Sequence, residues 1–176
     1  PNIIRNKDLT KPISRVEFAS VAVKVYEKLN GTKAIPVANN PFFDTSDVGV
    51  MKAFQIGAVN GTSPTTFAPD DLLNREQCAA MLTRVFKRIF LAGWTMDTDS
   101  AFKLDFDMPI LFADDADISE YARDSVYFMT ANGIIKGIGG NMFAPNNSTA
   151  AQGAERYANA TREQALAIAV RILKVG

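Results

Sequence analysis

Apolar residues recur at helical spacing in three separate segments of this 176-residue chain. In each segment they occupy positions i, i+3, i+4 and i+7, which place one apolar stripe on one face of a helix. The aligned sets are Phe18, Val21, Ala22 and Val25; Cys78, Met81, Leu82 and Val85; and Ala165, Ile168, Ala169 and Ile172. We therefore predict three long helices whose stripes pack against one another as the core of an all-α protein.

The three helices are predicted to begin with the same four-residue pattern. The copies are Ser14-Arg15-Val16-Glu17, Asn74-Arg75-Glu76-Gln77 and Thr161-Arg162-Glu163-Gln164. The first side chain of each copy can cap the helix and the Glu or Gln three residues later can reach back, which is the capping-box arrangement. An Arg beside the positive end of the helix dipole is unfavourable, so its recurrence indicates an anion held jointly by the Arg and the helix start. On this dipole argument, replacing Arg162 by Ala should leave stability unchanged or slightly improved.

Two matched turn motifs lie upstream of the second and third helices. Gly57 and Gly61 are followed by Phe67-Ala68-Pro69, and, with identical spacing, Gly133 and Gly137 are followed by Phe143-Ala144-Pro145. Gly is favoured just past a helix end, so short helices are predicted before each motif, over 46–57 and 117–132. A Phe-x-Asp motif precedes each short helix, and its Asp, Asp44 or Asp114, is expected to cap that helix.

These elements form a repeating unit of Phe-x-Asp, short helix, Gly-x-x-x-Gly turn, Phe-x-Pro, capped Arg and long helix. The second unit, 42–91, and the third unit, 112–174, are complete. The first unit, 1–30, has only the last part, because Lys7 and Leu9 stand where Phe and Pro are expected. We expect its missing half to precede these residues in a longer polypeptide.

Two stretches fall outside the repeat. One is 93–111, which contains Trp94 and several Asp residues, and the other is 146–160, a polar insertion before the third long helix. Both are expected to be surface excursions. The chain as a whole, 1–176, is interpreted as a single module.

Composition narrows the classes of function. Lys plus Arg and Asp plus Glu number 19 each, so no net field attracts nucleic acid or an anionic membrane surface. Histidine is absent, which removes the commonest general base and the commonest transition-metal ligand. The lone cysteine, Cys78, lies in an apolar stripe and is expected to be a buried small hydrophobe. No run of about 18 apolar residues is present to span a membrane.

Acidic clusters raise calcium and glycosidase interpretations, which the spacing does not favour. Among Asp97, Asp99, Asp105 and Asp107, the residue where an EF-hand places a third ligand is Ala101, and no Gly follows for the sharp turn. No pair of carboxylates is indicated as acid and base across a cleft. We therefore expect no metal, no cofactor and no enzymatic activity.

Four motifs follow one another along the chain, namely Phe-x-Asp, Gly-Ile-Ile-x-Gly, Phe-x-Pro and the capped Thr-Arg-Glu-type motif. In this order they resemble the S-layer homology domain, which is found as tandem triplets in bacterial cell-surface proteins. The resemblance covers 14–30, 42–91 and 112–174. It implies a pseudo-threefold α-helical module, with a central three-helix bundle and with short helices and loops around it. It also implies an extracellular location at the cell wall or S-layer. The implied role is non-covalent anchoring of a larger polypeptide to an anionic secondary cell-wall polysaccharide, often one carrying pyruvate ketals.

The resemblance assigns ligand contact to the arginines of the capped motif. These are Arg15, Arg75 and Arg162, and a forked guanidinium group suits a carboxylate. The family's turn glycines correspond to Gly57, Gly61, Gly133 and Gly137, which are expected to affect binding through the shape of the loops. A basic residue also recurs along the long helices, at Lys24, Arg84 and Arg171, and this row is interpreted as solvated charge.

Two alternatives remain open. Each Arg can instead pair with a nearby carboxylate, and the chain can be a structural or protein-interaction module that keeps the fold without binding glycan. The chain also departs from the family pattern, because its second unit is shortened between Phe42 and Gly57 and lacks the aromatic residue that Tyr121 supplies in the third. The insertion 146–160 lies beside Arg162. The interpretations differ in whether the guanidinium groups open onto clefts or are covered by the excursions.

Overall fold

The computed structural model describes residues 1–147, 149–155 and 157–175. Over these residues the regular structure is helical and the backbone pairs outside helices are isolated bridges, which confirms the all-α prediction. The α-helices are α1 (Arg15–Asn30), α2 (Val48–Gln55), α3 (Arg75–Phe90), α4 (Glu120–Ala131), α5 (Ala150–Glu155) and α6 (Arg162–Val175). Short 3-10 helices are η1 (Asn2–Ile4), η2 (Met96–Ala101) and η3 (Asp115–Asp117).

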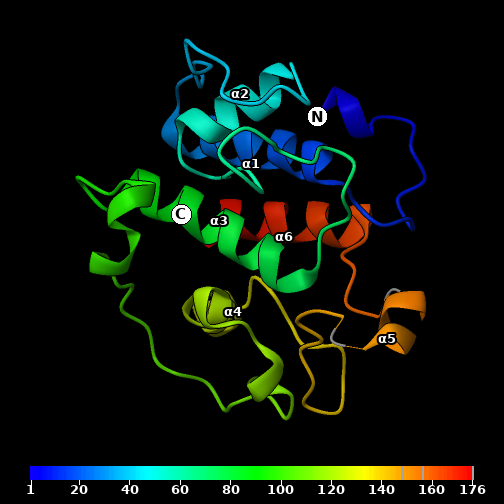
Figure 1. Cartoon of the computed structure of the whole chain (residues 1–176). Coiled ribbons are helices and arrows are strands. Elements are labelled where there is room, and N and C mark those ends of the chain that lie inside the picture. Colours follow the sequence, from blue (N-terminus) through cyan, green and yellow to red (C-terminus); the bar gives the residue numbers. More distant parts are fainter. Residues whose placement is uncertain (148, 156, 176) are drawn as a thin grey trace.

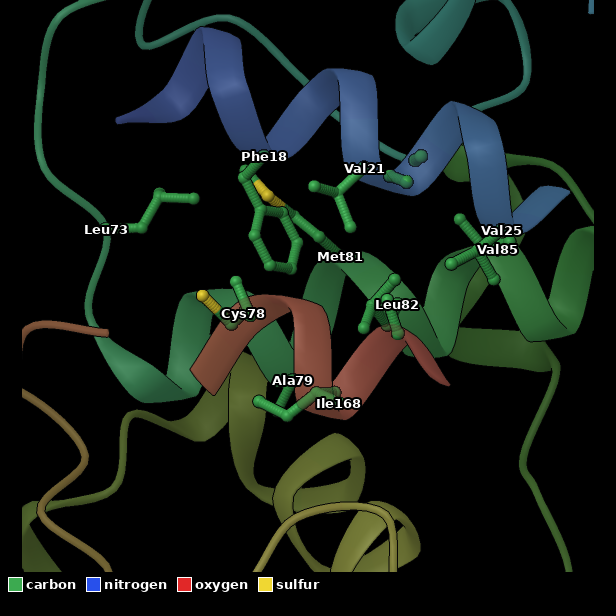
Figure 2. Close-up of a cluster of buried hydrophobic side chains, with 14 of the residues drawn as sticks. Phe18, Val21, Val25, Leu73, Cys78, Ala79, Met81, Leu82, Val85 and Ile168 are labelled. Carbon is green, nitrogen blue, oxygen red and sulfur yellow. The ribbon is translucent and has the colours of Figure 1, made fainter. Parts of the chain in front are cut away.

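The three long helices α1, α3 and α6 lie together at the centre of the molecule (Figure 1), with α1 packed against both α3 and α6. Figure 2 shows Phe18 and Val21 of α1 directed toward α3, and Ile168 of α6 beside Ala79 of α3. All twelve residues of the three aligned stripes are buried in one hydrophobic cluster. The predicted packing of the stripes is therefore confirmed.

Short helices cover the outer faces of the long ones, with α2 on α1 and α4 on α3. They are slightly shorter than predicted, since α2 spans Val48–Gln55 and α4 spans Glu120–Ala131. Each therefore packs on the long helix of the preceding unit. A lobe of the molecule is thus built from two successive units rather than from one.

A closed ring of backbone hydrogen bonds joins the chain just before the three long helices. The N–H of Ile13 donates to the carbonyl of Ala160 at 2.9 Å, that of Ala160 to Leu73 at 3.0 Å, and that of Leu73 to Ile13 at 3.1 Å. Each of the three residues immediately precedes an N-cap. The three helix starts are consequently fixed at one end of the core.

The helix starts are capped as predicted. The Gln77 side chain accepts the Asn74 N–H at 3.0 Å, and Asn74 accepts the Gln77 N–H at 2.9 Å. Thr161 and Gln164 form the same reciprocal pair at 3.1 and 3.2 Å. In the first helix the Glu17 carboxylate accepts the N-cap N–H at 3.1 Å. These bonds satisfy donors that a helix start leaves unpaired.

The expectation that Asp44 and Asp114 cap the short helices is wrong. Asp44 accepts the backbone N–H groups of Phe67 and Ala68, and Asp114 accepts those of Phe143 and Ala144 in the third unit. The cap of α2 is Asp47, which accepts the Val50 N–H at 3.0 Å. The two Asp residues instead fix the Phe-Ala-Pro loops, in which both Ala68 and Ala144 have a φ of 57°.

The first excursion is more firmly attached than its polarity suggests. Trp94 is 1% exposed, and its indole N–H donates to Asp99 at 2.7 Å. Asp99 also pairs with Lys87 of α3 at 2.7 Å. Beyond this anchor Leu104 and Phe106 also pack against the core, so the surface prediction for 93–111 holds only for its last part, where Met108 and Ile110 are exposed. The anchor was missed because the neighbouring Asp residues made the stretch appear polar throughout.

Shortening a core side chain in the stripes is expected to cost substantial stability. Val85 and Ile172 are fully buried, so truncation to Ala removes apolar contacts and leaves a cavity. We expect Ile172→Ala to lower the free energy of unfolding by about 2–4 kcal/mol, with a smaller loss for Val85→Ala. Urea denaturation measures the change. A loss below about 0.5 kcal/mol at Ile172 would be inconsistent with a core position.

The stability of the lobe formed by α1 and α2 is expected to depend on pH through Glu27. Burial alone would raise the pKa of Glu27, but hydrogen bonds from Lys33 and Lys24 lower it from 4.5 to about 2. Lys52 of α2 also pairs with this carboxylate at 3.4 Å. A depressed folded-state pKa gives stability that is present above about pH 4.5 and lost as the pH falls toward 2.

The test compares urea midpoints between pH 5 and pH 2. Glu27→Gln should flatten the fall in stability over this range, because the variant has no carboxylate to protonate at that position. Glu120→Gln is the matched control, since Glu120 is exposed and has no ion pair among the described residues. If the urea midpoint fell equally steeply with pH in Glu27→Gln and in the parent chain, the assignment of this pH dependence to Glu27 would be contradicted.

Candidate functional site: arginine-lined grooves

Arg15 begins α1, yet its side chain lies buried in the loop of the second unit. Its Nε donates to the Phe67 carbonyl at 2.9 Å and its Nη2 donates to the Asn60 carbonyl at 2.9 Å. The guanidinium carbon lies 4.7 Å from the centroid of the Phe67 ring. The loop thus orients this Arg without neutralising it.

Arg75 repeats this arrangement in the loop of the third unit. Its Nε donates to the Phe143 carbonyl at 2.8 Å, its Nη2 donates to the Lys136 carbonyl at 2.6 Å, and its guanidinium lies over the Phe143 ring at 5.0 Å. Burial lowers the pKa of both Arg15 and Arg75 below the ordinary value of a guanidinium group. Neither side chain forms an ion pair with a described carboxylate.

The turn glycines have the structural role that was expected for them. Gly57 and Gly133 adopt φ values of +77° and +66°, a region that residues with side chains rarely occupy. At Gly61 a Cβ would collide with the Ser63 carbonyl oxygen, and at Gly137 it would lie 2.5 Å from a carbonyl oxygen. The second glycine of each turn directly follows a carbonyl that holds an Arg. Loop shape therefore positions the guanidinium groups.

Each loop-held Arg opens onto a groove, and the two grooves have equivalent walls. The first groove, of about 140 Å³, is lined by Arg15, Asn60 and Gly61 together with Gln77, Met81 and Arg84 of α3. The second groove, of about 360 Å³, is lined by Arg75, Lys136 and Gly137 together with Gln164, Ile168 and Arg171 of α6. Position by position, the second set repeats the first one unit later. Tyr121 of α4 adds an aromatic wall to the first groove.

Arg84 and Arg171 give each groove a second guanidinium. Arg84 is half-buried and forms no hydrogen bond or ion pair with the described part of the chain, and burial lowers its pKa. Arg171 donates to the Ile134 carbonyl at 3.1 Å. The interpretation of this basic row as solvated charge is therefore wrong for the half-buried Arg84, whereas Arg171 is exposed. Each of the two residues lies ten positions after its N-cap, and this shared spacing was a signal of a common role. The sequence did not indicate which loop faces them.

At the third helix start the Arg is neutralised from within the chain. Arg162 donates from Nε and Nη2 to the two oxygens of Glu17, both at 2.9 Å, and from Nη1 to the Asp8 carbonyl. Lys7 donates to the same carboxylate at 2.6 Å. Burial raises the pKa of Glu17, but these hydrogen bonds and that from the Ser14 N–H outweigh burial and lower it. Arg162 thus follows the alternative of pairing with a nearby carboxylate.

The position around Arg162 and Glu17 corresponds to the other two grooves, and we refer to it as the third groove. A cleft of about 570 Å³ lies beside it, reaches neither of these two residues, and is lined by η1 residues together with Arg5, Lys7, Lys24 and Leu166. Lys24 is the counterpart of Arg84 and Arg171, but its side chain is 58% exposed and pairs with Glu27. The third groove therefore differs from the other two in both of its basic positions.

Other sites receive less support from the structure. Cys78 is fully buried, and burial raises the pKa of its thiol, so it is unsuited to act as a nucleophile. No group of three or more His, Cys, Asp or Glu in the described ranges could hold a metal ion. No described helix has the length and apolarity needed to cross a membrane.

The third unit supplies the loop that holds Arg75, and this part of the chain has a recognisable family. Residues 111–149 match the family model of the S-layer homology domain. This segment of the chain is therefore similar to an S-layer homology domain. The match includes Gly133, Gly137 and the Phe-Ala-Pro loop, so the second groove is partly built from it. S-layer homology domains are non-catalytic modules that anchor proteins at the cell surface.

A curated protein extends the similarity beyond the matched S-layer homology domain. The chain is 24% identical to an amylopullulanase from Thermoanaerobacterium thermosulfurigenes over 164 residues, which is 93% of this chain. The chain spans 8% of the length of that relative. No solved structure matches the chain.

Proposed function

We propose that residues 1–176 form one S-layer homology module with pseudo-threefold symmetry. Its units would be 1–30, 42–91 and 112–174, and the excursions 93–111 and 146–160 would interrupt this pattern. The hydrogen-bonded ring of Ile13, Leu73 and Ala160 supports this proposal, because equivalent positions of the three units bond to one another in a cycle.

We further propose that the module anchors a surface protein by binding an anionic secondary cell-wall polysaccharide. The observation that carries this proposal is the pair of equivalent grooves, each with two guanidinium groups that no described carboxylate neutralises. Two guanidinium groups facing one groove suit a carboxylate, such as that of a pyruvate ketal. The groove loops add backbone and amide groups that can bind sugar hydroxyls.

The location that follows is extracellular, at the cell wall or S-layer. The relative is much longer than this chain, which supports further domains in the same polypeptide as the cargo of the anchor. Neither nucleic acid nor membrane insertion is part of this proposal, since the formal net charge is zero and the described helices do not span a bilayer.

The experiment is cosedimentation with purified sacculi before and after chemical removal of their secondary polymer. We expect the chain to sediment with complete sacculi and to remain in solution with stripped ones. Soluble polymer should compete, because it fills the same grooves. Equal sedimentation with both preparations would overturn glycan binding and favour the interaction-module alternative.

A further inference from the structure

The third residue of each long helix performs the same capping role but differs in charge. The side-chain oxygens of Glu17, Gln77 and Gln164 each accept the N–H of their own N-cap residue, at 3.1, 3.0 and 3.1 Å. Glu and Gln serve equally in a capping box. Capping alone therefore does not account for a carboxylate in one helix and an amide in the other two.

These three residues also lie next to the Arg of the preceding unit. Gln77 and Arg15 line the first groove together, and Gln164 lines the second groove with Arg75. In the cyclic order of the units, Glu17 stands in the same relation to Arg162, which it binds through both oxygens. The charge of this residue thus decides whether the neighbouring guanidinium is already paired.

We propose, on the basis of the function above, that Glu17 replaces the ligand's carboxylate at Arg162 and closes this position of the third groove to anions. Its two oxygens accept hydrogen bonds from Nε and Nη2 of Arg162, and one of these oxygens also pairs with the ammonium group of Lys7. An incoming carboxylate would meet like charge and no unpaired donor pair. The neutral amides at 77 and 164 leave the charges of Arg15 and Arg75 available.

Glu17 is accordingly a specificity-determining residue, and the module has two anion sites rather than three. The side chain of Glu17 is 1% exposed, so solvent does not screen the pair effectively. Its substitution by Gln would preserve the cap and restore the arrangement of the other two grooves.

The test uses the whole chain and the pyruvate ketal of a methyl mannoside as the probe. NMR follows the guanidinium Nε–H signals of Arg15, Arg75 and Arg162 during titration. In the parent chain, we expect the first two to shift and Arg162 to remain unchanged. In Glu17→Gln, the Nε–H signal of Arg162 should shift on titration. The affinity of the probe at Arg162 should be at least tenfold above that in the parent chain.

The reverse variants provide the matched control and do not depend on the stability of Glu17→Gln. Gln77→Glu should weaken probe binding at Arg15 at least tenfold without changing Arg75, and Gln164→Glu should do the opposite. Thermal melts verify that each variant is folded. Full probe binding at Arg15 in Gln77→Glu, or an Arg162 signal that titrates in the parent chain, would overturn the proposal.

The outcome for this inference can be separated from that for glycan anchoring. If sacculi fail to bind while Glu17→Gln still gains a carboxylate response at Arg162, Glu17 is the anion substitute and the polysaccharide is the wrong ligand. If sacculi bind and Glu17→Gln leaves Arg162 silent, anchoring stands and the role of Glu17 is rejected.

Discussion

Affinity for sacculi is expected to fall by about two to four orders of magnitude in the double variant Arg84→Ala/Arg171→Ala. An Arg contact to an ionised group is worth about 1.5–3 kcal/mol, which corresponds to a roughly ten- to hundredfold loss in each groove. Because two grooves can act on one polymer, each single variant should lose much less through avidity. Cosedimentation isotherms with sacculi measure the loss.

These two arginines are preferred to Arg15 and Arg75 because their removal leaves the groove loops intact. Arg15 and Arg75 each hold two loop carbonyls, whereas Arg84 holds none and Arg171 holds one. Lys24→Ala is the matched control, since it changes the same helix position in the groove that Glu17 closes. Unchanged binding by a double variant that circular dichroism shows to be folded would remove these residues from the site.

Replacing Arg162 by Ala is expected to lower the free energy of unfolding by about 2–4 kcal/mol. This revises the expectation from the helix dipole, which considered the cation alone. The structure places the Glu17 carboxylate, 1% exposed, against Arg162, and the variant leaves that buried charge with Lys7 as its remaining cation. The penalty of the unpaired charge exceeds the few tenths of a kcal/mol gained at the dipole. Urea denaturation at pH 7 measures the difference.

A double-mutant cycle separates the pair from other effects of truncation. Arg162→Ala/Glu17→Gln should recover a large part of the stability lost by Arg162→Ala, because no carboxylate then remains buried without its partner. Additive losses in the two single variants would show that the pair contributes little. Thr161→Ala, in which the cap is lost and the ion pair is kept, should cost about 1 kcal/mol and provides a scale.

Local sequence signals predicted the helices well because each signal acts within a few residues. The stripes containing Val25, Val85 and Ile172 specified three buried faces, and the capping residues marked where the long helices begin. Gly57 and Gly133 marked the ends of the short helices through the φ values that they adopt. These features depend on the chain's own periodicity and not on which units become neighbours.

Contacts between units could not be read from the chain in the same way. Asp44 was interpreted as a local cap, but its partners are the N–H groups of Phe67 and Ala68, more than 20 residues away. Arg162 and Glu17 belong to opposite ends of the sequence, so neither suggested the other. Arg84 appeared solvated because the sequence does not indicate which loop covers that side of α3.

The ring through Ile13, Leu73 and Ala160 joins the starts of α1, α3 and α6 into one junction that no two of them can form alone. A two-unit fragment that ends before Ala160 would leave the Ile13 N–H without its acceptor and the Leu73 carbonyl without its donor. During synthesis the ring can close only after Ala160 has left the ribosome. The junction between the first two helix starts therefore stays incomplete until then. Deleting one of the three helix starts would therefore open the junction that the other two share, and would not simply remove one groove.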